Sequence, residues 1–271
     1  MAEDETALIN GSTRLFAIVG DPIAQVGSPR VFNPRFRRAG INAVLVPFHV
    51  LQGEFEEAMR GLMRLANLDG IVLTVPFKKR AAALVHHLGV AARQAGGINA
   101  MRRDPDGRWS GEMFDGLGLV RAIELAGRSL AGQRVLLLGA GGAGSSIAPA
   151  FAAAGARAIT LFDTETGRAD ALAARVRSFH PACEIAPGTP RAASHDVIVN
   201  ASPVGMRPGD GLPADLGNID PATLVVDIIP KPEITPLVAA ARLAGCQTVG
   251  GLAMIDAQAD RILEFFRVPG F

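Results

Sequence analysis

The amino-acid sequence predicts an α/β protein built from two domains. Short apolar runs at residues 15–19, 43–48 and 70–73 alternate with helical stretches, and the same alternation resumes at residue 134. The 271 residues are enough for two ordinary domains, each with its own hydrophobic core. A glycine-rich turn at residues 139–144 follows an apolar strand and opens an alanine-rich helix. These observations together favour parallel strands covered by helices.

In the first half of the chain, local start and stop signals define the expected elements. Ser28 followed by Pro29 has the N-cap and N1 pattern of a helix start. Pro76 breaks a strand, after which a helix is expected, and the turn sequence Asp-Pro-Asp-Gly predicts an antiparallel pair. The expected elements are strands at residues 15–19, 43–48 and 70–73, helices at 28–40, 54–65 and 77–88, and paired strands at 96–102 and 108–112.

The second half predicts a parallel sheet whose strands are joined by helices. The expected elements are a helix that follows Asp115 and runs through Gly127, strands at 134–138, 158–162, 196–200, 224–228 and 248–249, a helix after the glycine turn, and helices at 167–179, 235–244 and 251–266. Because the last helix follows the last strand of this sheet, it can return to the first domain. The expected domains are therefore residues 1–113 plus 251–271 and residues 114–250.

The glycines at Gly139, Gly141, Gly142 and Gly144 have the GxGxxG spacing in the context that this motif needs. Glycine allows positive φ and a close approach of the backbone to a ligand. The following helix aims N–H groups and the positive end of its dipole at the turn, which suits a pyrophosphate. A glycine-rich corner without a ligand is the alternative, but a strand before the turn and a helix after it favour a dinucleotide site.

Composition excludes several classes of partner. The 27 basic and 26 acidic residues leave a formal net charge of +1, which provides no field for nucleic acid or an anionic membrane. The polar N-terminus lacks an apolar core, and no apolar run approaches the roughly 20 residues that span a bilayer, so a cytoplasmic protein is expected. The chain has no Tyr, which excludes a short-chain dehydrogenase with a catalytic tyrosine.

Cysteine, histidine and nucleophile chemistry are not indicated. The two cysteines, Cys183 and Cys246, lie far apart and are expected to be free, inert thiols. His86 and His87 would point apart on the helix expected there, and no spacing of His, Cys and carboxylates indicates a metal site. Neither a GxSxG elbow nor a P-loop lysine is present, so hydrolase and kinase activities have no support.

A series of motifs, taken in order, resembles the shikimate/quinate dehydrogenase family over nearly the whole chain. The motifs are GDPIAxxxSP from Gly20, TVPFK from Thr74, GxxNA from Gly96, DGxG from Asp115, GAGGAG from Gly139, NASPVGM from Asn200, DxxxxxxxTP from Asp227 and GLxMxxxQ from Gly251. The resemblance implies a two-domain α/β fold, with an N-terminal α/β substrate domain and a C-terminal Rossmann NAD(P)-binding domain. It also implies hydride transfer between nicotinamide C4 and a ring carbinol carbon, an oxidoreductase activity of aromatic amino acid biosynthesis.

The resemblance assigns proton transfer to Lys78 and Asp115, the lysine of TVPFK and the aspartate of DGxG. Oxidation of an alcohol requires a group within hydrogen-bond reach to take the hydroxyl proton, and Lys78 is expected beyond the carboxyl end of a strand, where open α/β sheets bind ligands. From the residues alone, Lys78 could instead be a solvated helix lysine beside Lys79 and Arg80, and Asp115 an ordinary N-cap.

Four further residues match family positions that bind the hydroxyls or carboxylate of the substrate: Ser28, Thr74, Asn99 and Gln258. Ordinary structural explanations also exist. Ser28 could be only an N-cap, Asn99 a turn residue and Gln258 an exposed helix residue. We expect the set to contact substrate.

Several family positions differ in this chain. Val26 replaces the first serine of the family's SxSP, and Met113 and Phe114 replace the asparagine and threonine of NTDG. Val72 and Pro230 stand where the family has an asparagine and a substrate-side tyrosine. Since each lost buried hydrogen bond costs about 1 kcal/mol or more, we expect a more apolar pocket and a substrate that is related to shikimate or less polar.

The turn after residue 162 bears on the choice of cofactor. NADP-specific relatives carry an NRT-like segment there, whose arginine pairs with the 2′-phosphate, whereas this chain has Asp163, Thr164 and Glu165. An aspartate about 20 residues past the glycines binds ribose hydroxyls and repels a 2′-phosphate, which predicts NAD over NADP. A helix-capping acidic turn, with Arg168 reaching a phosphate, is the alternative. The expected cofactor-binding residues are Gly139, Ala140, Gly141, Gly142, Ala143, Asp163, Thr164, Arg168, Ala201, Ser202, Ile228, Gly251 and Met254.

The sequence therefore predicts a shikimate dehydrogenase-like oxidoreductase that prefers NAD and acts on a small cyclic hydroxy acid, as a monomer or homodimer and without a metal. A true shikimate or quinate dehydrogenase is one alternative. A catalytically weak NAD-binding or ligand-sensing relative is another. The presence of both Lys78 and Asp115 argues against the last, because a binding protein need not keep a proton-transfer pair.

Overall fold

The chain folds into two units in a computed structural model that describes residues 9–271; the first part of the expected polar leader, residues 1–8, lies outside the described residues. The first unit comprises the chain up to Phe114 together with Ala259–Phe271, and the second comprises Asp115–Gln258. The expected domains place the return to the first domain at residue 251, whereas the return observed here falls inside the last helix.

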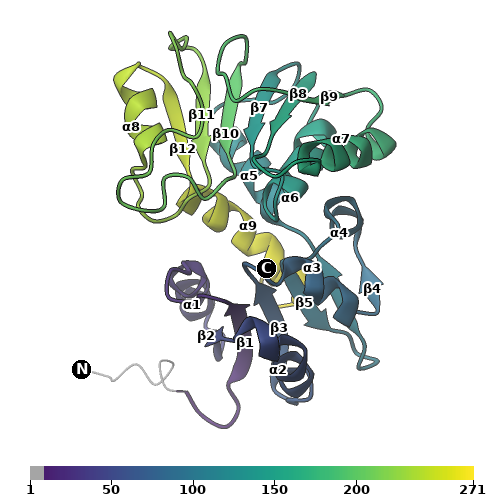
Figure 1. The fold of residues 1–271 in the computed structure, drawn as a ribbon. Helices are drawn as coiled ribbons and strands as arrows, with labels where there is room; N and C mark the ends of the chain where they lie inside the picture. Colours follow the sequence, from purple (N-terminus) through teal and green to yellow (C-terminus); the bar gives the residue numbers. More distant parts are fainter. Residues whose placement is uncertain (1–8) are drawn as a thin grey trace, which may run out of the picture. The chain divides into compact units, whose positions relative to one another are not determined.

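The first unit contains a mixed sheet of six strands in the order β2-β1-β3-β5-β6-β4. β1 pairs in parallel with β2 and β3 (Figure 1), β5 is antiparallel to both β3 and β6, and β4 is parallel to β6. The strands are β1 (Arg14–Gly20), β2 (Ala43–His49), β3 (Leu68–Leu73), β4 (His87–Leu88), β5 (Ala100–Arg103) and β6 (Trp109–Glu112). The helices are α1 (Ser28–Arg38), η2 (Gln52–Glu54), α2 (Phe55–Leu62), α3 (Lys78–Ala81), η3 (Ala82–Leu84) and α4 (Val90–Ala95).

Two sequence-based expectations for the first unit are wrong. The helix expected through Leu88 ends at Leu84, because residues after it pair with β6: the N–H of His86 donates to the carbonyl of Trp109 at 2.8 Å, and Leu88 lies opposite Gly111. His86 and His87 therefore do not lie on a helix. Ser28 is also not the N-cap of α1; that position is Gly27, and no side chain caps the helix.

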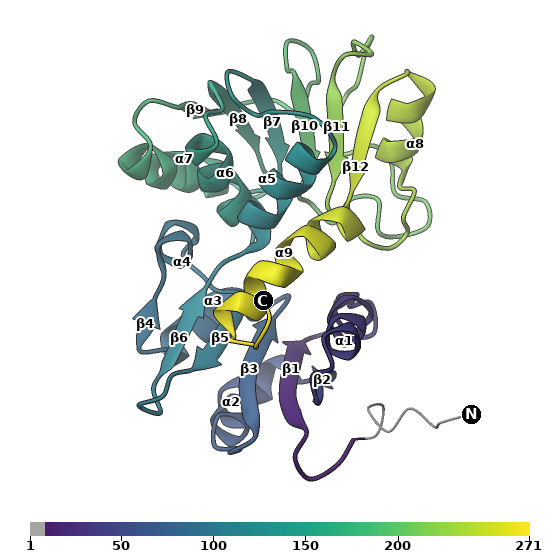
Figure 2. The same cartoon turned by 180° about the vertical axis from the view of Figure 1, so that it is seen from behind.

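The second unit is built on six parallel strands in the order β12-β11-β10-β7-β8-β9 (Figure 2). This is the strand order of a Rossmann sheet, with its reversal between β7 and β10. The strands are β7 (Arg134–Leu138), β8 (Ala158–Phe162), β9 (Glu184–Pro187), β10 (Val197–Asn200), β11 (Leu224–Asp227) and β12 (Gln247–Gly250). The helices are α5 (Asp115–Leu125), α6 (Gly144–Ala153), α7 (Arg168–Phe179), α8 (Pro236–Leu243) and α9 (Gly251–Phe265).

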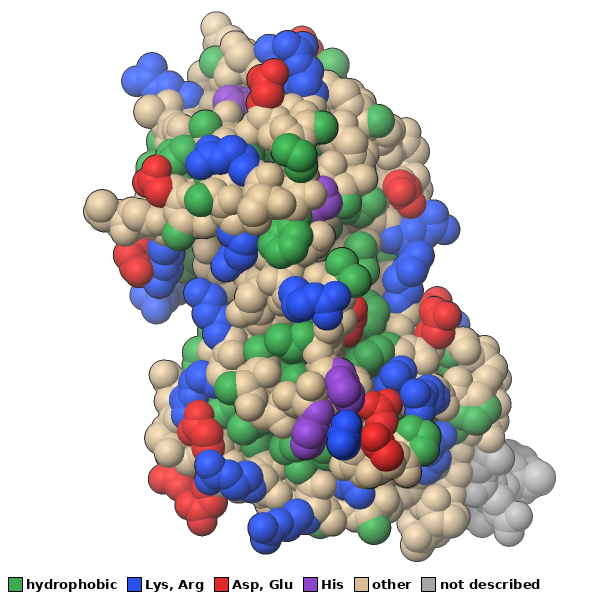
Figure 3. Space-filling view, turned by 90° about the vertical axis from the view of Figure 1, so that its right-hand side faces the viewer, with side chains coloured by type: hydrophobic (Ala, Val, Ile, Leu, Met, Phe, Trp, Pro, Cys, Tyr) green, Lys and Arg blue, Asp and Glu red, His purple; other side chains and the backbone are tan. Residues whose placement is uncertain are grey.

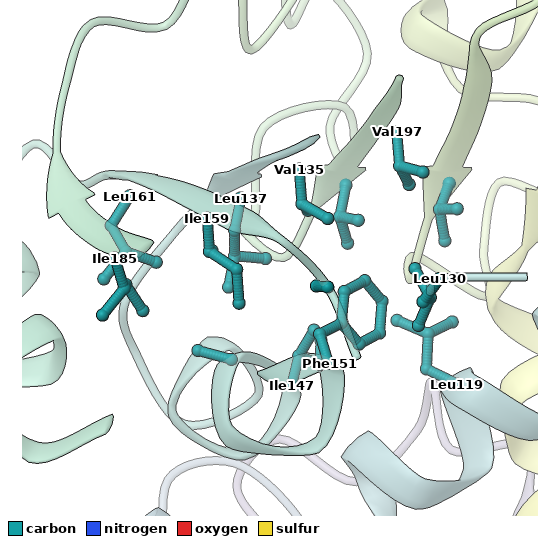
Figure 4. Close-up of a cluster of buried hydrophobic side chains, with 14 of the residues drawn as sticks. Leu119, Leu130, Val135, Leu137, Ile147, Phe151, Ile159, Leu161, Ile185 and Val197 are labelled. Atoms are coloured by element: carbon teal, nitrogen blue, oxygen red, sulfur yellow. The ribbon is translucent and has the colours of Figure 1, made fainter. Parts of the chain in front are cut away.

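The core of the second unit packs α6 against the centre of its sheet. Ile147 and Phe151, both on α6, are fully buried and lie in one cluster with Val135 and Leu137 of β7 (Figure 4). Burial of such side chains contributes about 1.5–3 kcal/mol each. This packing fixes the start of α6 directly behind the glycine turn.

The face shown in Figure 3 carries no large patch of one charge, because Lys and Arg lie among Asp and Glu there. That mixture agrees with the formal net charge of +1. Within residues 9–271, no helix combines the length and the apolar character that crossing a membrane requires.

Gly144 offers a stability test of the turn, because a Cβ at this position would overlap the carbonyl oxygen of Gly139. We expect Gly144→Ala to lower the stability of the second unit by about 2 kcal/mol, which corresponds to a fall in Tm of about 5 °C. Gly141→Ala is the control, since its added Cβ would meet nothing within 4 Å. Thermal unfolding followed by circular dichroism measures both variants, and equal Tm values would contradict the packing described.

Candidate active site

Thr74 lies at the carboxyl edge of the first sheet, where the chain leaves β3. The N–H of Thr74 donates to the carbonyl of Val19 at 3.0 Å, and the N–H of Asp21 donates to the carbonyl of Val75 at 3.0 Å. Both bonds join the end of β1 to the segment after β3. Because ligands of open α/β sheets bind at the carboxyl ends of strands, Thr74 is held at the expected ligand edge.

Lys78 is the first residue of α3, and its backbone is anchored on both sides. Its carbonyl accepts a hydrogen bond from the N–H of Ile98 at 2.9 Å. The neighbouring Phe77 is fully buried and stacks on Phe55 with ring centroids 4.2 Å apart. Lys78 is half-buried, whereas Lys79 is exposed. The two lysines therefore have different surroundings, and Lys78 does not have those of a fully solvated helix lysine.

Asn99 is a bridging residue rather than a turn residue. Its side chain is buried, and its Oδ1 accepts a hydrogen bond from the N–H of Phe114 at 2.8 Å. Its backbone joins two strands. The carbonyl of Asn99 accepts from the N–H of Leu73 at 2.8 Å, and the N–H of Asn99 donates to the backbone carbonyl of Glu112 at 3.0 Å. Asn99 is thus held against Leu73, the last residue of β3, which directly precedes Thr74.

Most residues expected to make the pocket apolar lie in hydrophobic clusters instead. Met113 packs in the cluster that contains Phe77, and Phe114 packs near Phe265, with ring centroids 5.5 Å apart. Val72 is buried in the same cluster as Phe114. These side chains replace polar family residues by filling the core, so they do not support the expected change of pocket. Val26 also packs against the cluster of Val72 and Phe114, but it is only half-buried and lies two residues before a candidate substrate residue, Ser28.

Asp115 and Gln258 belong to the second unit, whereas Lys78 belongs to the first. Asp115 is the first residue of α5 and not the residue before the helix, and it is only 3% exposed. Gln258 is 6% exposed, so the alternative of an exposed helix glutamine is wrong. Near Gln258, α9 packs closely on α5: a Cβ added at Gly118 of α5 would lie only 2.6 Å from the Cβ of Gln258.

The glycine turn and the chain after β10 meet at the carboxyl edge of the second sheet. Gly139 has φ +99°, and a Cβ there would lie 2.8 Å from the carbonyl carbon of Ala201. Gly141 faces open space, and Ser146 in the first turns of α6 has a buried hydroxyl without a hydrogen-bond partner. An open glycine backbone at a helix N-terminus fits a pyrophosphate. Gly142 and Ala143 complete the turn before α6.

Asp163 follows β8 and joins the glycine turn to the next turn. Its Oδ2 accepts from the N–H of Ala140 at 2.7 Å, and its Oδ1 accepts from the N–H of Glu165 at 2.8 Å. Arg168 pairs with Glu165 at 2.5 Å and lies 3.9 Å from Asp163. Thr164 is exposed. Three charged side chains, two acidic and one basic, therefore surround the place where a dinucleotide's adenosine ribose is expected.

The remaining expected cofactor residues have mixed surroundings. Ala201 and Ser202 begin the loop after β10, and Ile228 follows β11 with its N–H donating to the carbonyl of Asn200 at 3.1 Å. Gly251 begins α9 against the backbone of Ile228. Met254 is buried in the hydrophobic cluster of the second unit, so its side chain packs in the core.

A buried network at Asn200 and Asp227 was not assigned a role from sequence. Asn200 Nδ2 donates to Asp227 Oδ1 at 3.2 Å, and the Thr235 hydroxyl donates to Asp227 Oδ2 at 2.6 Å. Burial raises the pKa of Asp227, and the bonds from Thr235, Ile229 and Asn200 oppose that rise. The motifs contain all these residues, but nothing in their spacing shows that neighbouring strands place them side by side.

Metal and thiol chemistry have no support within the described residues. No group of three or more His, Cys, Asp or Glu side chains there could hold a metal ion. Cys183 and Cys246 are free and buried, and burial raises the pKa of both thiols. Neither thiol is thus activated as a nucleophile.

The strand order and glycine turn of the second unit are those of a dinucleotide-binding domain, and the first unit presents a lysine at a ligand edge. Together they define the class of two-domain NAD(P)-dependent dehydrogenases. Models of known protein families identify the same two parts. A model described as "Shikimate dehydrogenase substrate binding domain" matches residues 18–101, and one described as "Shikimate / quinate 5-dehydrogenase" matches residues 122–205.

Individual proteins are similar over nearly the whole chain. A shikimate dehydrogenase (NADP(+)) of Rubrobacter xylanophilus is 36% identical over 251 residues, which cover 91% of this chain and 88% of that protein. The crystal structure of shikimate 5-dehydrogenase from Listeria monocytogenes, in complex with shikimate and NAD, has a TM-score of 0.87 and 28% identity over 98% of this chain and 94% of that one. The ligand-free 5-ketofructose reductase of a Gluconobacter species has a TM-score of 0.84 and 26% identity over 94% and 92%.

The chain belongs to the shikimate/quinate dehydrogenase family. It is a shikimate dehydrogenase-like oxidoreductase that depends on NAD(P), and the family and fold class expected from its motifs are confirmed. The expected preference for NAD has no support from these relatives, because one is named for NADP(+) and another holds NAD.

Proposed function

We propose that the chain catalyses reversible hydride transfer between NAD(P) and a ring hydroxyl of a cyclic hydroxy acid of the shikimate or quinate type. The observation that carries this proposal is the anchored, half-buried Lys78 beside Thr74 and Asn99 at one sheet edge. Membership of the family supports the same chemistry.

In this proposal, Lys78 and Asp115 handle the proton. A carbinol becomes a carbonyl only if its hydroxyl proton leaves, and the Nζ of Lys78 takes it during oxidation and returns it during reduction. The carboxylate of Asp115 holds the substrate hydroxyl and the lysine in position. Ser28, Thr74, Asn99 and Gln258 bind the other hydroxyls and the carboxylate of the substrate. Bound NAD(P) supplies or accepts the hydride.

Val26 is the difference that supports an altered substrate. In place of the first serine of SxSP it leaves one hydroxyl, that of Ser28, to meet a ring carboxylate. The replacement of that serine by Val26 weakens binding less for a substrate whose carboxylate is displaced or missing than it does for shikimate. The 5-ketofructose reductase with the same fold makes a polyol ketone a second candidate substrate, since a polyol carries no carboxylate.

We also propose that NAD is preferred over NADP. Asp163 and Glu165 place two negative charges beside the single positive charge of Arg168. A 2′-phosphate would meet a net negative turn, and Thr164 stands where NADP-specific relatives carry an arginine. Ribose hydroxyls, in contrast, can donate to the Asp163 carboxylate, which still has lone pairs beyond its two backbone bonds.

Replacement of Lys78 tests the proton-transfer role. We expect Lys78→Met to lower kcat by about 100-fold or more, since general acid–base catalysis contributes about that factor, while the Kd for NADH changes less than about twofold. Lys79→Met is the matched control, because this neighbour is exposed, and it should keep wild-type kcat. Unchanged turnover by the Lys78 variant would remove this lysine from the mechanism. A wild type that binds NADH but turns over no substrate would favour the binding-protein alternative.

A substrate panel with Val26→Ser tests the altered pocket. Shikimate, quinate, related ring hydroxy acids and a polyol ketone are compared by absorbance of the reduced cofactor. We expect Val26→Ser to lower the KM for ring carboxylates by about tenfold, because it restores a hydrogen bond to a charged group. The KM for the polyol ketone, which has no carboxylate, should not change. Normal family efficiency of the wild type with shikimate would end the altered-pocket proposal in favour of a true shikimate dehydrogenase.

Cofactor choice is tested by comparing kcat/KM for NAD and NADP. We expect the wild type to favour NAD by about tenfold or more, and Thr164→Arg to lower the KM for NADP by about tenfold through a bidentate contact to the 2′-phosphate. Thr166→Arg adds the same charge at another exposed position of this turn and serves as control. A wild-type preference for NADP would refute the role given to Asp163.

A further inference from the structure

Asn200 and Asp227 form a buried polar pair at the carboxyl ends of two neighbouring strands of the second sheet. Asn200 is the last residue of β10 and Asp227 the last of β11, and the two are direct partners in the parallel register. Asn200 is 0% exposed and Asp227 1%. A buried carboxylate is costly unless hydrogen-bonded, so its partners indicate what it does.

Asn200 ties the following loop, residues 201–206, back onto the strand end. Its Oδ1 accepts from the N–H of Ser202 at 3.1 Å and from the Ser202 hydroxyl at 2.6 Å. Its Nδ2 donates to the carbonyl of Val204 at 3.0 Å, and the Ser202 hydroxyl accepts from the N–H of Val204 at 3.2 Å. The side-chain amide of Asn200 thus fixes the backbone of both Ser202 and Val204. These bonds exist only while the oxygen of the amide faces Ser202 and its nitrogen faces Val204.

Asp227 fixes that orientation of the amide. Its Oδ1 accepts from Asn200 Nδ2 at 3.2 Å and from the N–H of Ile229 at 3.1 Å. Its Oδ2 accepts from the Thr235 hydroxyl at 2.6 Å, and Thr235 in turn accepts from the N–H of Val238 as N-cap of α8. An asparagine turned the other way would place its oxygen against the carboxylate. Repulsion between two acceptors therefore holds the nitrogen toward Asp227.

The loop that this network holds is the one that touches the glycine turn. The backbone of Ala201 and Ser202 lies so close to Gly139 that a Cβ there would be 2.8–2.9 Å from it. The N–H of Ala201 donates to the carbonyl of Leu138 at 2.7 Å, which fixes the start of the loop on β7. Dinucleotides bind at the point where the strand order reverses, here between β7 and β10. Residues 201–206 therefore form one wall of that crevice.

We propose that Asp227 is a positioning residue for cofactor binding: it orients the amide of Asn200, which holds residues 201–206 against the glycine turn in the form that binds the dinucleotide. The inference rests on the proposed function, because it concerns binding of NAD(P). What the network requires of residue 227 is an acceptor facing Asn200. An asparagine at 227 can supply it, with its own NH2 donating to a lone pair of Thr235.

Variants at residue 227 test this inference through direct binding. We expect Asp227→Ala to raise the Kd for NADH about tenfold or more, measured by fluorescence titration, because the loop is no longer held in one form. Asp227→Asn should stay within about threefold of wild type. At saturating NAD, kcat of both variants should remain within about twofold of wild type, since Lys78 and Asp115 are unchanged. A loss confined to cofactor Kd and KM separates positioning from general damage.

Two further comparisons guard against a variant that fails to fold. Thr235→Val removes the hydroxyl that donates to Asp227, whereas Thr235→Ser keeps it, so the first should weaken NADH binding and the second should not. Thr223→Val is the matched control: Thr223 is also buried, directly before the opposite end of β11, and its replacement should leave the Kd unchanged.

The outcomes separate this inference from the proposed function. NADH binding by Asp227→Ala or Thr235→Val with wild-type Kd would overturn the positioning role alone. The same role fails if Thr223→Val weakens binding as much as Thr235→Val does. A wild-type chain that binds neither NADH nor NADPH would overturn both the proposed function and this inference. Titration with NADPH in parallel keeps the positioning role testable even if the preferred cofactor is NADP.

Discussion

The second unit depends on one close approach, that of Gly139 to the backbone of Ala201. The two parallel strands β7 and β10 are neighbours in register, so the chains leaving them start side by side and must diverge. Without a side chain at Gly139, the loop after β10 can lie against the glycine turn, and φ +99° turns the chain toward α6. That turn sets the start of α6 and leaves the backbone at Gly141 open. It also brings the N–H of Ala140 to the carboxylate of Asp163, which accepts a hydrogen bond from it.

In the first unit, apolar packing and backbone hydrogen bonds hold the polar residues of the candidate site in place. The backbone on both sides of Lys78 is fixed by apolar packing of Phe77 and by a hydrogen bond from Ile98, and neither group is reactive. Asn99 is oriented by the backbone of Phe114, a residue whose own side chain lies in the core. The polar edge is therefore supported by an apolar interior, and replacements in that interior, such as Met113, change packing more directly than they change chemistry.

Most of the fold could be predicted from sequence, because strand, turn and helix signals act over a few residues. The glycine turn, the antiparallel pair around Asp-Pro-Asp-Gly and the last helix are local patterns of this kind. Local signals do not predict residues 85–88 correctly, because the conformation of these residues is set by pairing with β6, more than 20 residues away. The same limit explains the site. The motifs indicate Lys78, Asp115 and Asn99 as candidate site residues. The Asn200–Asp227 pair is created by strand register, and the burial of Met113 and Phe114 by tertiary packing, and motif spacing reveals neither.

Helix α9 belongs to both units, and this division has a consequence for the order in which they can fold. The residues of α9 from Ala259 onward complete the first unit: the ring of Phe266 stacks on Phe16 with centroids 5.2 Å apart, and Arg102 donates to the carbonyl of Phe265 at 2.6 Å. These residues leave the ribosome after every residue of the second unit. Domains usually complete their folding in the order of synthesis. Here that order is inverted: the unit that begins first is the last to close its core, because the ring of Phe266 reaches Phe16 only after the whole second unit has been made.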